Sequence, residues 1–149
     1  MNRTILNFGT RYPKALVAVS LLVAASYAVR SYGRAESAPK PTPTKLGIVI
    51  YSGDPETVWN AFRFASFAQK QGDQVKVFLL AKGVESESLD NERFKVTEQM
   101  KSLVDQGGEI LACGTCLKLR HAEGTKLCPV SNLQDLYKIV KESDKVLSF

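Results

Sequence analysis

The sequence lacks the features that define several common protein classes. Its 149 residues include three cysteines, too few for a scaffold held together by disulfides. It contains neither GxGxxG nor GxxxxGK(S/T), so a nucleotide-driven function has no motif support. Hydrophobic residues make up 44% and charged residues 23%, which excludes disorder throughout and a low-complexity fibre. This length and balance predict one globular domain of ordinary size.

Acidic residues are almost absent from the first 45 positions. Glu36 is the only acid there, against seven lysines and arginines, so this part carries +6 and the remaining residues carry −1. The basic charge of the whole chain therefore belongs to its N-terminal part. This excludes a basic globular domain that binds nucleic acid, and it favours contact with a membrane surface.

The N-terminal part contains an uncharged apolar run at residues 15–29. Extended to residues 12–32, a helix would be about 31 Å long, close to the roughly 30 Å of a hydrocarbon core. Lys14 and Arg30 would then extend toward the headgroups, and Tyr12 and Tyr32 would lie at the two interfaces. We therefore predict a basic region at 1–14 and a single transmembrane anchor at 15–32. Basic residues on both sides leave the side of the membrane undetermined.

A cleaved signal peptide is the alternative for this segment. A basic start, an apolar run and several small-residue patterns fit it, and cleavage would give a secreted or periplasmic protein. Residues 33–45 follow as a linker whose three prolines, Pro39, Pro41 and Pro43, favour an extended spacer. The folded domain is predicted to cover residues 46–149.

Apolar runs at residues 46–51, 75–80, 110–112 and 145–149 predict strands of a parallel sheet, because they do not alternate. Helical patterns lie between them, which predicts an α/β fold with helices on both sides of the sheet. A further strand is possible near Leu127. Residues 83–93 are polar and acidic and predict an exposed loop.

The helices have recognisable starts and apolar faces. Asp54 followed by Pro55 predicts the start of a helix. Its apolar residues occupy more than one side, which indicates deep burial or contact with another subunit. A second helix is predicted around residues 96–104, ended by two glycines. A third should begin with a capping box at Ser131 and Gln134 and bury one apolar face. The residues of that face are Leu133, Leu136, Tyr137 and Val140.

The chemistry of the sequence concentrates at Cys113 and Cys116, in the stretch ACGTC. Cys113 follows a predicted strand and precedes a helical pattern, so it should lie at the carboxyl edge of the sheet, where open α/β sheets bind ligands. A helix N-terminus and the nearby Lys118 and Arg120 favour thiolate over thiol, and a thiolate attacks sulfur donors. The plainer interpretation is two buried cysteines that act as small hydrophobic residues.

A metal site is a further alternative. Cys113, Cys116, His121 and Cys128 supply three thiols and one imidazole, a legitimate set of zinc ligands in an unusual spacing. His121, the only histidine, also fits an exposed loop residue. Cys128 could approach Cys113 across the sheet edge or be inert.

The stretch GEILACGTCL at residues 108–117, together with residues 48–52, 131–137 and 143–146, resembles the DsrE-like family of sulfur-relay proteins. The likeness is closest to the DsrE-like domain of YedF-type sulfurtransferase-like proteins. The resemblance implies a three-layer α/β/α fold with a mainly parallel five-stranded sheet and assembly into trimers or hexamers. It also implies that Cys113 carries sulfur as a persulfide, while Cys116 belongs to the pattern of the subgroup.

The sequence therefore predicts a membrane-tethered sulfur carrier, sulfurtransferase-like, that binds sulfane sulfur on Cys113. Its expected partners are donor and acceptor proteins or small sulfur compounds, the membrane and further copies of itself. No cofactor is expected. A thiol–disulfide oxidoreductase that uses Cys113 and Cys116 is one alternative function, and a non-enzymatic zinc-binding or interaction module is another.

Overall fold

A computed structural model describes residues 42–149. The predicted basic region, the apolar segment at 15–32 and most of the proline-rich linker lie outside these residues. None of the helices in residues 42–149 has the length and hydrophobicity that a membrane span requires.

Five strands and five helical segments follow one another along the described chain. The strands are β1 (Lys45–Ile50), β2 (Gln74–Leu79), β3 (Glu109–Cys113), β4 (Val130–Ser131) and β5 (Lys145–Ser148). The α-helices are α2 (Pro55–Gln71), α3 (Val96–Asp105), α4 (Gly114–Lys118) and α5 (Leu133–Glu142), and η1 (Ala81–Ser88) is a 3₁₀-helix.

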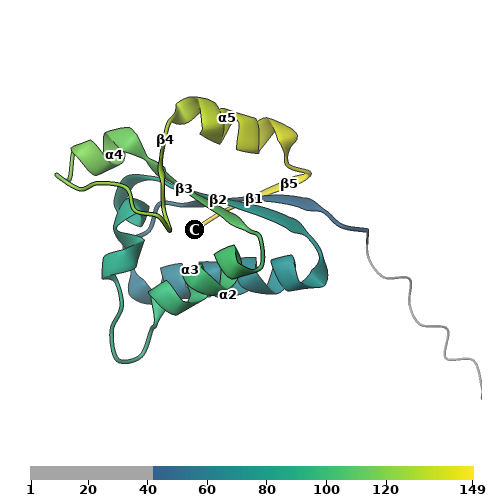
Figure 1. Ribbon diagram of the computed structural model, residues 1–149, viewed down its shortest axis with the longest axis horizontal. Coiled ribbons are helices and arrows are strands. Elements are labelled where there is room, and N and C mark those ends of the chain that lie inside the picture. The colour runs from purple at the N-terminus through teal and green to yellow at the C-terminus, as the bar shows by residue number, and fades with distance from the viewer. Residues whose placement is uncertain (1–41) are drawn as a thin grey trace, which may run out of the picture. The chain divides into compact units, whose positions relative to one another are not determined.

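The five strands form one sheet in the order β4-β3-β2-β1-β5. Every neighbouring pair is parallel, as the continuous apolar runs predicted. Helices α2 and α3 lie on one face of the sheet, and α5 lies on the other (Figure 1). The predicted α/β class and five-stranded parallel sheet are therefore confirmed. The extra strand expected near Leu127 is β4, three residues further along.

The face beneath α2 and α3 carries most of the core. Ile48, Val77 and Ile110 from the three central strands are buried against Phe62 of α2 and Met100 of α3.

Asp54 starts α2 as predicted, because its carboxylate accepts a hydrogen bond from the backbone N–H of Thr57 at 2.8 Å. Val58, Phe62 and Ala65 of α2 are buried, while Phe64 and Phe67 on its other side are exposed.

The polar stretch after β2 differs from the predicted loop. Its first half is η1, which packs close to the sheet, and Gly83 and Ser86 within it are buried. The hydroxyl of Ser86 donates to the carbonyl of Gly83 at 2.6 Å, so this polar side chain is satisfied without water. The prediction of an exposed loop is therefore wrong for residues 83–88, because it rested on their polar composition alone.

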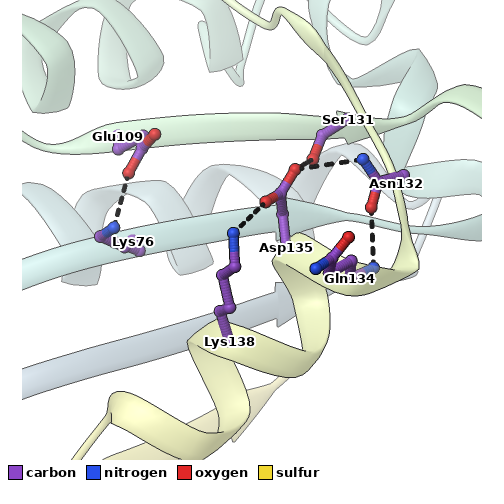
Figure 2. Close-up of polar contacts among 7 residues, drawn as sticks. All are labelled: Lys76, Glu109, Ser131, Asn132, Gln134, Asp135 and Lys138. Atoms are coloured by element: carbon purple, nitrogen blue, oxygen red, sulfur yellow. Dashed lines mark hydrogen bonds and ion pairs between the residues drawn. The ribbon is translucent and has the colours of Figure 1, made fainter.

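Helix α5 begins one residue later than the predicted capping box. Asn132 is the N-cap, and its side chain accepts a hydrogen bond from the backbone N–H of Gln134 at 2.8 Å (Figure 2). The Ser131 hydroxyl donates instead to the carboxylate of Asp135 at 2.8 Å. The predicted pairing of Ser131 with Gln134 is therefore wrong, although the start of a helix at this point is correct.

The inward face predicted for α5 is also wrong. Ile139 is buried and Leu136 is half-buried, whereas Leu133 and Tyr137 are 67% and 63% exposed. The reason lies in the strand beneath, because a Cβ atom at Gly47 would come within 2.8 Å of the Ile139 side chain. Gly47 thus leaves room for Ile139, which turns the stripe of Leu133, Tyr137 and Val140 away from the sheet.

Candidate functional site

Two neighbouring strands end at the candidate site. Cys113 is the last residue of β3, and Ala81 follows β2 by two residues. Strands β2 and β3 are parallel, and their pairing runs from Lys76 opposite Glu109 to Leu79 opposite Ala112. Their carboxyl ends therefore lie side by side. The single turn of α4 then places Cys116 next to both, so the structure brings Cys113 and Cys116 together.

Cys113 is buried. Its exposed fraction is 4%, and it belongs to a small apolar cluster with Phe78 of β2 and Ile139 of α5. The predicted helix after Cys113 is short, because α4 has five residues. Few peptide dipoles add up in one turn, so the helix contributes less electrostatic support to Cys113 than the sequence indicated.

Cys116 is the more exposed of the two thiols, and it has a backbone partner. The N–H of Ala81 donates to the sulfur of Cys116 at 3.3 Å. Ala81 has a φ of 51°, an uncommon conformation for a residue with a side chain. Local backbone strain of this kind clusters at functional sites.

Several groups shift the pKa of Cys116, and they act in opposite directions. Burial raises the pKa of Cys116, and a hydrogen bond with the Cys113 thiol raises it further. The Ala81 amide and the positive charge of Arg120 act in the opposite direction without overcoming burial. Cys116 is therefore a protonated thiol at neutral pH, with donors in place for an anion on its sulfur.

Arg120 is fixed beside the pair. Its guanidinium Nη1 donates to the backbone carbonyl of Cys116 at 3.2 Å, and its Nε lies 3.6 Å from the carboxylate of Glu85 in η1. Arg120 is partly buried, so its charge is less screened by water than that of a fully exposed arginine.

Cys128 belongs to a different environment. It is buried in the main core cluster, and its backbone N–H donates to the Thr125 hydroxyl at 3.0 Å. Burial raises the pKa of Cys128, and the carboxylate of Glu87, which also hydrogen bonds to the thiol, raises it further. Cys128 therefore stays a protonated thiol, as in the inert alternative.

The four proposed zinc ligands do not form a metal site. Residues 42–149 contain no group of three or more His, Cys, Asp or Glu side chains that could hold a metal ion. His121 is exposed and lines a cavity of about 600 Å³ together with Gly114 and Val130. This matches the interpretation of His121 as an exposed loop residue.

Sequence reasoning missed two groups, one at the cysteine pair and one beside Cys128. The first is the backbone amide of Ala81, which no side chain marks in the sequence. The usable signal was its position just after β2, the strand that pairs with β3. Glu87 was assigned to an exposed loop, whereas its carboxylate accepts a hydrogen bond from Thr125 at 2.7 Å and contacts the Cys128 thiol.

Comparison with known proteins assigns the chain to a family. The profile of the DsrE/DsrF-like family matches residues 44–149, which include all of the sheet and the cysteine pair. The chain belongs to the DsrE/DsrF-like family. The resemblance inferred from the residues around Cys113 is thereby confirmed, while the closer likeness to YedF-type proteins stays a prediction.

Two archaeal relatives are similar over much of this DsrE/DsrF-like domain. An uncharacterized protein of Methanopyrus kandleri is 35% identical over 103 residues, covering 63% of this chain and 83% of the relative. An uncharacterized protein of Methanocaldococcus jannaschii is also 35% identical over 103 residues, covering 63% of this chain and 88% of the relative.

Proposed function

We propose that this protein is a sulfur carrier that holds sulfane sulfur as a persulfide on Cys113, with Cys116 as its partner thiol. Membership of the DsrE/DsrF-like family suggests a role of the sulfur-relay type. The observation that carries the proposal is the pairing of two free thiols at the carboxyl edge of the sheet, with the Ala81 amide donating to one of them.

The surroundings of Cys113 suit storage of sulfur. A persulfide is lost to reductants and to competing thiols in solution, and a position that is 4% exposed slows this loss. The neighbouring Cys116 can exchange sulfur with Cys113 because the single turn of α4 places the two thiols next to each other. Donor and acceptor would be proteins or small sulfur compounds.

We also propose that the apolar segment at 15–32 tethers the domain to a membrane. The support is its length and its basic flanks. Signal cleavage, which would release a secreted or periplasmic protein, is the competing outcome. Labelling of Cys116 in intact cells with a membrane-impermeant thiol reagent would identify the side on which the domain lies.

A thiol–disulfide oxidoreductase is the second candidate, because two adjacent thiols can also form a disulfide. The two functions differ in what Cys116 must do. A reductase needs both sulfurs in every cycle, whereas a carrier with Cys116 replaced by serine can still hold sulfur on Cys113. Persulfide that forms on Cys113 in Cys116→Ser would argue against the reductase.

Intact-mass measurement of the full chain tests the carrier function. After incubation with polysulfide, the wild type should gain about 32 Da, the mass of one sulfur atom, which dithiothreitol removes. The double variant Cys113→Ser/Cys116→Ser should gain nothing, because Cys128 stays a buried, protonated thiol. Cys128→Ser is the matched control and should load like the wild type. An adduct that persists in the double variant would refute the proposal.

We further propose that the chain assembles with copies of itself through α5. The stripe of Leu133, Tyr137 and Val140 is apolar and exposed on the described domain. Three large apolar residues that follow one another at helical spacing on an exposed face are typical of an interaction surface.

The mass of the full chain in mild detergent, measured by sedimentation velocity, tests this interface. The wild type should sediment as a trimer or hexamer, and Leu133→Glu/Tyr137→Glu as a monomer, because the interface would have to bury two carboxylates. Gln134→Glu adds one carboxylate to the same helix outside the stripe and should leave the oligomer intact. A monomeric wild type would disprove assembly, and an unchanged mass of the double variant would disprove this interface.

A further inference from the structure

The two thiols of the pair differ in access. Cys113 is 4% exposed and packed among Phe78, Ile139 and Leu136, whereas Cys116 is only partly buried. Attack of a thiolate on a sulfur–sulfur bond needs an open path to the attacking sulfur. In this structure that path leads to Cys116.

We infer that Cys116 is the entry thiol, which takes sulfane sulfur from a small persulfide or polysulfide and passes it inward to Cys113. The inference rests on the proposed carrier function and adds the order of the two steps and the kind of donor. A small donor fits because Cys116 is only partly exposed and its own helix, α4, lies against η1.

Two fixed groups that stabilise negative charge lie beside Cys116. The Ala81 N–H lies 3.3 Å from its sulfur, and Arg120 is held beside it by the Cys116 carbonyl and by Glu85. The amide is positioned by η1, since the N–H of Leu80 donates to Ile50 and that of Gly83 donates to Leu80, both at 2.9 Å. These groups stabilise an anion on Cys116, both when it attacks and when it leaves.

The first step forms a bond between the sulfur of Cys116 and the sulfane sulfur of the donor. The Cys116 thiolate attacks R–S–SH, the sulfur–sulfur bond of the donor breaks, and its electron pair leaves with RS⁻. The proton that Cys116 lost on ionisation ends on RS⁻, so the products are the Cys116 persulfide and RSH. The step has no net oxidation or reduction.

The second step moves the same sulfur inward. The Cys113 thiolate attacks the outer sulfur of the Cys116 persulfide, and Cys116 leaves as a thiolate beside the Ala81 amide. The proton that Cys113 loses on ionisation ends on the departing Cys116 thiolate, so no proton is gained or lost in the step. The result is a persulfide on the buried Cys113 and a free thiol on Cys116, ready for the acceptor.

Time-resolved loading of the full chain tests this order. Wild type, Cys113→Ser and Cys116→Ser are incubated with glutathione persulfide, quenched with iodoacetamide and digested with trypsin. The tryptic peptide of residues 102–118 carries both cysteines, so fragment ions that separate Cys113 from Cys116 locate the extra sulfur. Urea denaturation of each variant confirms that it is folded, and Cys116→Ala serves as a second variant without a hydroxyl group.

We expect Cys113→Ser to acquire sulfur on Cys116 at the wild-type rate. Cys116→Ser and Cys116→Ala should load Cys113 at least about tenfold more slowly, because the buried thiol must wait for a local opening. Equal loading rates of Cys113 with and without Cys116 would overturn the order of transfer while the carrier function stands. Loading of neither thiol in the wild type would overturn the carrier function itself.

Discussion

Replacement of Gly83 by alanine is expected to lower the free energy of unfolding by about 3 kcal/mol. A Cβ atom at this position would lie 2.1 Å from the carbonyl oxygen of Ile50 and 2.8 Å from its carbonyl carbon. Both atoms belong to the backbone at the end of β1, so no side-chain rotation relieves the overlap. Either η1 or the end of β1 must shift.

Urea denaturation followed by the fluorescence of Trp59, the only tryptophan, measures this change. Gly72→Ala is the matched control, because Gly72 has a φ of 102° and an added Cβ would meet no atom within 4 Å. Its cost should be about 1 kcal/mol, the strain of a left-handed residue alone. Equal stability of Gly83→Ala and the wild type would show that η1 does not pack on β1 as described.

The three cysteines are expected to react with iodoacetamide at very different rates. Cys116 should be alkylated first, and Cys128 at least about 100-fold more slowly, because it is buried and kept protonated by burial and by the Glu87 carboxylate. Because the pKa of Cys116 is raised, its alkylation should be slower than that of an unperturbed cysteine near pH 7. The rate should rise about tenfold for each pH unit up to that pKa.

Peptide mapping of the alkylated protein over a range of pH provides both measurements. In denaturing urea the three thiols should react at similar rates, which controls for differences between the peptides. Glu87→Gln removes the carboxylate charge from beside Cys128 and should accelerate its alkylation at alkaline pH without affecting Cys116. Alkylation of Cys128 as fast as Cys116 in the folded protein would contradict the burial described above.

Much of the fold was predictable from the sequence, because burial on both faces of a parallel strand leaves a readable pattern. The continuous apolar residues around Ile48 and Val77 identified strands, and Asp54 followed by Pro55 identified the start of α2. These signals are local, and the structure agrees with them.

The predictions were wrong where the structure depends on packing between elements that are far apart in the sequence. The sequence of α5 offers two apolar faces, and Gly47 in a distant strand determines that Ile139 points inward. In the same way, Gly83 and Ser86 look like loop residues in the sequence. In the structure η1 approaches β1 so closely that Gly83 has no room for a side chain, and Ser86 is buried.

The candidate site was predictable in part. The spacing of Cys113 and Cys116 after a strand located the pair, because the carboxyl edge of a parallel sheet is fixed by topology. The burial of Cys113 and the amide of Ala81 were not predictable, since both depend on how β2, η1 and α5 meet around the pair.

Transfer of sulfur out of the loaded protein tests the central claim most directly. The full chain is loaded with polysulfide, desalted and mixed with glutathione, and the masses of both products are followed. We expect the adduct of about 32 Da to leave the wild-type protein and to appear in equal amount as glutathione persulfide, with both thiols regenerated. Release of hydrogen sulfide with formation of a Cys113–Cys116 disulfide would contradict the account and identify an oxidoreductase.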